Sequence, residues 1–134
     1  AARPADPDRG RALVAPFLRD LDKPLILALA RPVAKKNLAG LIDLYAASPA
    51  LRARANLAIL AGLRDGPDSG EPEQRRVIAG LLERLDRHDL YGCLALPKRH
   101  DRDDVLGCYA LARETGGIFV NPAFTEPYGL TLTE

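Results

Sequence analysis

Cysteine and histidine are both scarce in this sequence, which contains two of each. Cys93 and Cys108 do not form a C-x-x-C pair, and no set of histidines stands near them. The sequence therefore argues against a zinc site, because structural zinc takes closely spaced cysteine and histidine ligands. We expect two reduced, mostly buried thiols in a reducing cytoplasm, and no bound metal.

The chain also lacks an excess of charge of either sign and any long hydrophobic run. Its formal net charge is +1 over 134 residues, so no overall field favours nucleic acid or an acidic membrane surface. The longest apolar run, residues 25–30, is too short to span a bilayer, and no signal-peptide pattern is found. We expect a soluble cytoplasmic protein that binds neither nucleic acid nor membrane. Arginine greatly outnumbers lysine, which points to a GC-rich bacterial genome.

The sequence does contain a regular alternation of short apolar segments with longer amphipathic ones. Four segments are apolar on both faces, as are strands covered by helices on each side of a sheet: residues 25–30, 57–61, 90–96 and 118–121. The segments between them carry apolar side chains at helical spacing. This order predicts an α/β fold, a partial Rossmann-like three-layer α/β/α arrangement with a parallel sheet of about four strands.

Local signals set the expected limits of the helices between these strands. Ser48, followed by proline, should end the first helix, and Pro72 suits the first turn of the second. Asp103 or Asp104 is expected to cap the third.

The remaining segments are expected to be irregular. Residues 1–11 are rich in Pro, Arg and Asp and are predicted to be a linker, followed by one short helix before the first strand. Residues 62–72 are predicted to form a polar, flexible loop, because glycine and proline recur in them.

The segment directly after the fourth predicted strand carries two carboxylates, Glu126 and Glu134, around a Pro-Tyr-Gly turn. A strand that ends in a tight turn and opens a helix directs the N–H groups of the first helical turn at one point, which favours phosphate. Two carboxylates beside such a site can accept hydrogen bonds from the hydroxyls of a sugar and a ribose.

A second segment reaches the same edge of the predicted sheet. In open α/β sheets, ligands bind beyond the carboxyl ends of the strands, near the point where strand order reverses. The turn after the first strand, which carries Arg31 and Lys36, ends at that edge. A pair of cations opposite a helix N-terminus suits a diphosphate and stabilises charge that builds on a departing phosphate. Either motif alone means little, but their combination at one edge predicts a phosphate site.

Several stretches, in the same order along the chain, resemble sucrose-phosphate synthases. These enzymes are retaining GT-B glycosyltransferases, together with sucrose synthases and mannosylfructose-phosphate synthase. The Glu-x7-Glu element is shared by many GT-B enzymes, whereas the Arg-Pro-x-x-Lys-Lys-Asn and Tyr-Gly…Pro-Lys-x-His pieces narrow the resemblance to this branch. The similar stretches are residues 28–37, 51–57, 89–92, 96–100 and 118–131.

The resemblance implies that residues 23–134 are an incomplete C-terminal nucleotide-sugar-binding domain, preceded by a linker and short helix in residues 1–22. The intact enzyme would transfer glucose, with retention, from UDP-glucose to fructose 6-phosphate, which would bind through an N-terminal domain absent from this chain. The isolated segment would be inactive. No cofactor is implied, and Mg²⁺ is compatible with the motif but not required. The alternatives are another donor or acceptor, as in the related synthases, and a non-catalytic α/β association module.

The resemblance also implies roles for individual residues. Arg31 and Lys36 would hold the diphosphate and Glu126 the hydroxyls of the transferred sugar, so these three would serve the transfer itself. Further contacts would come from a base pocket at the end of the third strand, from amides around the distal phosphate and from a carboxylate on the ribose. These residues are, in that order, Cys93, Leu96 and Lys98; Gly129, Leu130 and Thr131; and Glu134.

Two positions depart from the family pattern. Cys93 stands where the family usually has Gln, and Leu63 stands where it has Asn in a Gly-Asn-Arg-Asp loop. His100 is expected to lie in a loop near the nucleotide. A truncated parallel sheet leaves an uncovered edge, so a dimer through the fourth strand is also expected.

Overall fold

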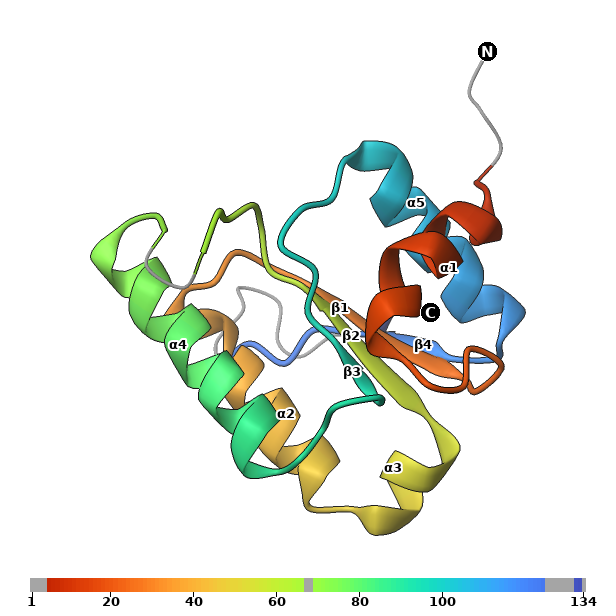
Figure 1. The fold of residues 1–134 in the computed structure, drawn as a ribbon, viewed down its shortest axis with the longest axis horizontal. Coiled ribbons are helices and arrows are strands. Elements are labelled where there is room, and N and C mark those ends of the chain that lie inside the picture. Colours follow the sequence, from red (N-terminus) through yellow and green to blue (C-terminus); the bar gives the residue numbers. More distant parts are fainter. Residues whose placement is uncertain (1–4, 67–68, 125–131, 134) are drawn as a thin grey trace.

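The computed structural model describes residues 5–66, 69–124 and 132–133. A sheet of order β3-β2-β1-β4-β5 lies between two layers of helices (Figure 1). The strands β1 to β4 are parallel, which confirms the predicted four-stranded parallel sheet of an α/β fold, and β5 pairs antiparallel with β4. The strands are β1 (Leu25–Leu29), β2 (Asn56–Leu60), β3 (Leu94–Ala95), β4 (Ile118–Val120) and β5 (Leu132–Thr133).

The central strand of the five-stranded sheet is β1. It pairs along its whole length with β2 and, through Ile26 and Leu27, with β4. The chain runs outward from β1 to β2 and β3 and then returns to place β4 on the other side of β1. The strand order therefore reverses between β1 and β4, and the carboxyl ends of these two strands mark the place where such sheets bind ligands.

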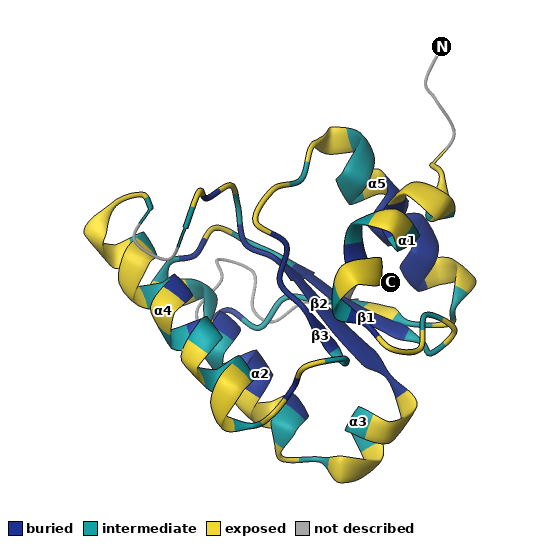
Figure 2. Cartoon of the chain, viewed as in Figure 1, coloured by how far each residue is buried: buried dark blue, intermediate teal, exposed yellow. Residues whose placement is uncertain are grey.

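The strands β1, β2 and β3 are buried almost throughout (Figure 2). Every residue of β2 and β3 is buried, as are the first four residues of β1. Because helices cover both faces of these strands, their uninterrupted apolar sequence has no solvent-facing side.

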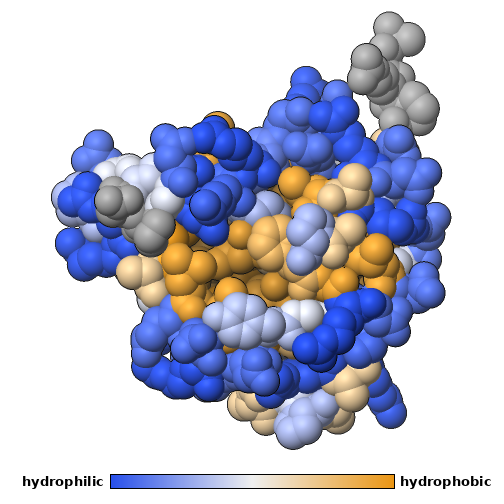
Figure 3. Space-filling view, viewed as in Figure 1, coloured by the Kyte–Doolittle hydropathy of each residue, from blue (hydrophilic) through white to orange (hydrophobic). Residues whose placement is uncertain are grey.

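One face of the sheet is covered by α2 (Leu38–Ala46) and α4 (Pro72–Arg87). Pro72 stands at the first turn of α4, as predicted, and Glu71 and Gln74 form a capping box around that turn. On the face seen in the space-filling view, hydrophobic residues gather at the centre and hydrophilic residues surround them (Figure 3). The buried residues that join these helices to the strands include Leu41, Ile42, Tyr45, Ile78 and Leu81 from the helices and Ile26, Leu57 and Ile59 from the strands.

The opposite face is covered by α1 (Pro7–Val14) and α5 (Arg102–Glu114). The prediction of a linker over residues 1–11 is wrong from Pro7 onward, because Asp6 caps a helix there and its carboxylate accepts from the Asp8 amide. The two helices cross where Gly10 and Gly107 face each other. A Cβ on either glycine would collide with the backbone of the other helix, so this close approach requires glycine at both positions.

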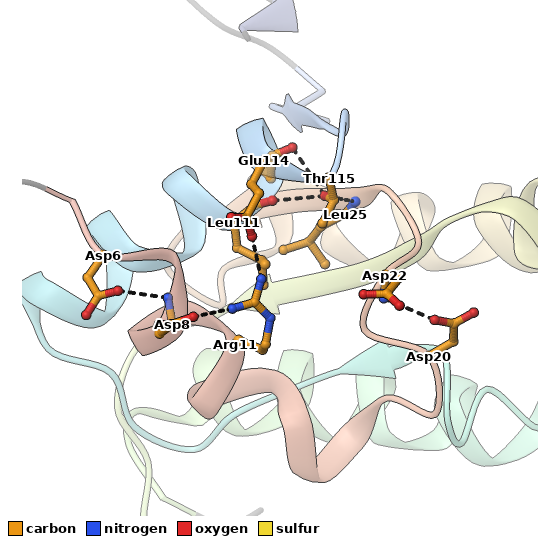
Figure 4. A network of polar contacts seen from close by, with 10 residues as sticks. Asp6, Asp8, Arg11, Asp20, Asp22, Leu25, Leu111, Glu114 and Thr115 are labelled. Carbon is orange, nitrogen blue, oxygen red and sulfur yellow. Dashed lines mark hydrogen bonds and ion pairs between the residues drawn. The ribbon is translucent and has the colours of Figure 1, made fainter.

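Polar contacts fix both ends of α5. Thr115 Oγ1 donates to the Leu111 carbonyl at 2.9 Å and accepts from the Leu25 amide at 3.0 Å, which joins the end of α5 to the start of β1 (Figure 4). Arg11 of α1 contacts Glu114 near the same end (Figure 4). At the other end Asp101 caps the helix, which corrects the prediction of Asp103 or Asp104. The Asp104 carboxylate instead accepts from the Asp101 amide and closes a reciprocal box.

The third strand is much shorter than the predicted residues 90–96. Asp89 and Gly92 both have positive φ, at 50° and 93°, and the Leu90 amide donates to the Leu85 carbonyl at 2.9 Å. These residues therefore form a turn that ends α4, and the extended chain starts only at Leu94.

A second local difference follows α2. Ser48 marks the end of that helix as predicted, but its hydroxyl also accepts from the Leu51 amide and caps a further helix, α3 (Pro49–Arg54).

The edge of β4 that was expected to be open is partly occupied. The backbone of β5 pairs with Phe119 and Val120. Ile118 nevertheless stays 44% exposed, and with Tyr109 and Phe119 it lines a pocket of about 410 Å³ beside α5. Dimerisation through this edge stays a prediction.

None of the helices in the described ranges is both long and apolar enough to cross a bilayer.

Candidate functional site

The turn after β1 is built by its own backbone. The Val33 amide donates to the Arg31 carbonyl at 2.8 Å, and the Lys36 amide donates to the Val33 carbonyl at 3.1 Å. A single turn of 3₁₀ helix, η2 (Ala34–Lys36), follows, and Asn37 then takes the left-handed conformation with φ of 56° before α2 begins. Asparagine tolerates this conformation better than most residues, which explains its place here.

Arg31 and Lys36 line one pocket at the carboxyl ends of β1 and β4. The pocket has a volume of about 300 Å³, and Phe119 and Asn121 from the β4 side complete its wall with Leu29 and Ala30. Arg31 is exposed and Lys36 is half-buried. The structure thus brings the two predicted cations together at the point where strand order reverses. Such a pair can bind a diphosphate by charge and by the planar donor set of the guanidinium.

Two hydrogen bonds join this turn to the segment after β4. The Asn37 side-chain amide donates to the Pro122 carbonyl at 3.0 Å, and the Phe124 amide donates to the Lys35 carbonyl at 3.1 Å. Gly40 leaves the space that the Asn37 side chain fills, because a Cβ there would overlap it. Sequence reasoning missed Asn37, although an asparagine between a strand turn and a helix is a signal for the left-handed conformation.

The predicted sugar, phosphate and ribose contacts lie outside the described residues. They are Glu126, Gly129, Leu130, Thr131 and Glu134. Their roles stay predictions. The described segment from β4 to Phe124 precedes them in the sequence and starts at the edge that carries Arg31 and Lys36.

Cys93 does not lie at this edge. It directly precedes β3, its carbonyl accepts from the Leu57 amide at 2.9 Å, and β3 pairs with the start of β2. It lines a pocket of about 390 Å³ with Arg19, Lys23 and Arg52, at the amino ends of the strands. Cys93 was predicted to lie in a base pocket at the carboxyl ends of the strands. Because β3 starts late, this residue lies at the amino ends instead, which corrects the prediction.

The other two residues of the predicted base pocket do lie at the carboxyl edge. The Leu96 side chain belongs to the core and is 2% exposed. Lys98 is exposed, and its carbonyl accepts from the Arg64 amide at 2.9 Å. Leu96 can therefore contribute backbone atoms to a ligand site, whereas Lys98 can contribute its side chain.

Arg64 was not predicted as a site residue, yet it organises the loop after β3. It is 7% exposed, and its guanidinium donates to the Pro97 carbonyl at 3.2 Å and the Leu96 carbonyl at 3.1 Å. Burial lowers the pKa of this guanidinium. The loop after β2, predicted to be flexible, is thus tied to the sheet edge at Arg64. The signal for this residue in the sequence is the Gly-x-Arg-Asp pattern of residues 62–65.

His100 is the last residue of the loop after β3. Its Nε2 atom is buried and has no hydrogen-bond partner among the described residues. Within that part of the chain, no group of three or more His, Cys, Asp or Glu residues is placed to hold a metal ion.

The chain is similar in sequence to known sucrose-phosphate synthases. No protein-family model matches the chain. It is 47% identical over 118 residues to the sucrose-phosphate synthase of Spinacia oleracea, and 46% identical over 118 residues to a probable sucrose-phosphate synthase 1 of Craterostigma plantagineum. Each alignment covers 88% of this chain and 11% of the relative, so the chain spans about a ninth of the length of these curated proteins.

Two solved structures share the fold. A sucrose-phosphate synthase of Thermosynechococcus elongatus superposes with a TM-score of 0.58 at 24% identity, covering 92% of this chain and 27% of that one. The apo structure of OtsA gives a TM-score of 0.56 at 15% identity, covering 81% of this chain and 28% of that one. The chain is therefore similar in sequence to one part of sucrose-phosphate synthases, and it shares its α/β fold with these two solved structures.

Proposed function

We propose that this chain is the donor-binding segment of a retaining hexosyltransferase that moves glucose from UDP-glucose to fructose 6-phosphate. The observation that carries the proposal is the pocket shared by Arg31 and Lys36 at the carboxyl ends of β1 and β4. The similarity to sucrose-phosphate synthases over 88% of the chain supports the same assignment. Fructose 6-phosphate would bind to parts of the protein beyond these residues. A cytoplasmic location belongs to the proposal and is consistent with the two free cysteines.

In the proposed reaction, the bond between the anomeric carbon of glucose and the β-phosphate oxygen breaks. The acceptor hydroxyl attacks from the same face, and its proton passes to the departing phosphate. Negative charge grows on that phosphate, and the cations of Arg31 and Lys36 stabilise it more strongly in the transition state than in the ground state. Glu126 would orient the sugar hydroxyls, and Glu134 would hold the ribose.

The base would meet the loop after β3. Because Cys93 lies at the amino ends of the strands, the candidate groups for contact with the base are the backbone around Leu96 and the side chain of Lys98. A related enzyme with another donor, such as GDP-mannose, or with free fructose as acceptor, would use the same fold. A non-catalytic association module is the alternative of another class.

An NMR titration of the ¹⁵N-labelled chain tests the donor site directly. UDP, ADP, GDP and inorganic pyrophosphate would be added separately, and we expect amide shifts at residues 30–37 and 121–124, with UDP the tightest nucleotide. Tighter binding of GDP would favour the alternative donor. Absence of shifts at millimolar concentrations, or shifts confined to the opposite edge around Arg19 and Lys23, would overturn the assignment and favour an association module.

A further inference from the structure

Arg64 binds three consecutive carbonyl groups of the loop after β3. Its guanidinium donates to the carbonyls of Leu96 and Pro97, and its backbone amide donates to that of Lys98. The distances are 3.1, 3.2 and 2.9 Å, respectively. One residue from the loop after β2 therefore fixes the direction of three peptide groups in the next loop.

The charge of Arg64 is not needed to balance an acid. Across the described residues its guanidinium contacts only carbonyl oxygens, although the side chain is 7% exposed. A buried cation without a carboxylate costs folding free energy, so a neutral apolar residue would fill this position more cheaply if only packing mattered. We therefore attribute the arginine at this position to the hydrogen bonds that it donates to the loop.

Besides Arg64, the loop is held by the buried side chain of Leu96 and by an ion pair between Arg99 and Asp65. The strand before it, β3, has two residues and pairs with the rest of the sheet only at Leu94 and Ala95. The loop then runs for residues 96–100 before Asp101 caps α5. The three bonds from Arg64 fix the direction of the carbonyls of residues 96–98, which neither the ion pair nor side-chain burial does.

The bonds to Arg64 also determine which backbone groups face outward. In a planar trans peptide, the carbonyl and the next residue's N–H point in opposite directions. With the carbonyls of Pro97 and Lys98 turned toward Arg64, the N–H groups of Lys98 and Arg99 point away from it. The loop thus offers two adjacent donors, which suit the acceptor atoms on the edge of a nucleobase.

We propose that Arg64 is a positioning residue that sets base selectivity at the donor site without touching the ligand. This inference rests on the proposed function, because it assigns the loop of residues 96–100 to the base of the nucleotide whose diphosphate lies at Arg31 and Lys36. The loop stands two strands away from β1 in the sheet, about 10 Å along the edge. The base and the diphosphate would therefore contact separate parts of the chain.

Two substitutions and a matched control test the proposal. Arg64→Met removes both guanidinium bonds, and Arg64→Lys keeps a cation that cannot donate to both carbonyls in the same planar geometry. The control is Arg52→Met, because Arg52 also donates to two consecutive carbonyls, those of His88 and Asp89, but near the amino ends of the strands. The probes are UDP, GDP and inorganic pyrophosphate, titrated against the 134-residue chain with affinities read by NMR.

We expect the substitutions at Arg64 to change the affinity for the base and to leave the affinity for the phosphates unchanged. Arg64→Met should weaken UDP roughly tenfold or more and reduce the difference between UDP and GDP, while pyrophosphate affinity stays as in the wild type. Arg64→Lys should give the same pattern to a smaller extent, and it keeps the test valid if the methionine variant does not fold. Faster exchange of the residue-64 amide, which donates to the Lys98 carbonyl, should accompany both. Arg52→Met should alter neither affinity.

Other results would overturn the proposal in distinguishable ways. If UDP and pyrophosphate weaken together, Arg64 supports the fold as a whole rather than the base loop. If the wild type binds pyrophosphate but shows no preference among nucleotides, the diphosphate site stands and the role of Arg64 in selectivity falls. If the wild type binds neither probe, the proposed function fails and this inference fails with it.

Discussion

The side-chain amide of Asn37 donates a hydrogen bond of 3.0 Å to the carbonyl oxygen of Pro122, a residue 85 positions away. Together with the bond from the Phe124 amide to the Lys35 carbonyl, it joins the turn after β1 to the segment after β4. These two segments form two sides of the candidate site. One of the two bonds that place them therefore comes from an asparagine that also takes a left-handed backbone conformation.

Substitution of Asn37 should separate its two roles. Asn37→Gly keeps the left-handed conformation but removes the amide, so pyrophosphate affinity should fall severalfold while the free energy of unfolding changes by about 1 kcal/mol. Asn37→Ala removes the same amide but keeps a Cβ in the left-handed region, so it should cost roughly 1–2 kcal/mol more than Asn37→Gly. Urea denaturation and NMR titration measure the two effects. Equal stability of both variants would contradict the conformational role.

The two cations of the pocket should matter for phosphate binding. Arg31→Ala or Lys36→Ala should each lower pyrophosphate affinity about tenfold or more, with a smaller effect at high salt. In a protein where this segment supports transfer, turnover should fall by roughly 10². Lys23→Ala is the matched control, because Lys23 lies near the amino ends of the strands. Near-normal affinity in both pocket variants would refute the diphosphate assignment.

The crossing of α1 and α5 should tolerate no side chain at Gly107. A Cβ there would meet the backbone of Gly10 and Asp6, so Gly107→Ala should lower the free energy of unfolding by about 1–3 kcal/mol. Gly80→Ala is the control in α4, where the nearest atom belongs to the end of the flexible Arg84 side chain. That variant should be neutral or slightly stabilising. Thermal unfolding compares them, and an unaffected Gly107→Ala would show that the helices can move apart.

The stability of the fold should fall at alkaline pH through Cys108. Burial raises the pKa of this thiol to about 12, and the charge of Asp104 adds to the shift. In the unfolded chain the thiol ionises near its ordinary pKa of about 8.5. The contribution of Cys108 is thus complete below that pH and is lost as the pH rises toward the folded value. Cys108→Ala should flatten the decline of unfolding free energy between about pH 9 and pH 10; an unchanged slope would assign the decline to other groups.

Hydrophobic pattern alone was sufficient for the sheet and for part of the site. The strands are short and apolar on both faces, and the helix starting at Pro72 carries its apolar residues on one side, so each is visible in a local window of sequence. The topology rule for parallel sheets then placed Arg31 and Lys36 at one edge. These predictions held because burial and strand direction follow from residues that are neighbours in the chain.

Tertiary contacts decided the rest. Cys93 lies at the far edge because a turn stabilised by positive φ at Asp89 and Gly92 delays β3, and the apolar pattern does not distinguish that turn from strand. Arg64 and Asn37 act through carbonyls 32 and 85 positions away, and hydrogen bonds over such separations leave no periodic trace in a sequence. The sequence by itself determined the layers and the edge where a ligand would bind. Only the folded chain determined which loops are held together at that edge.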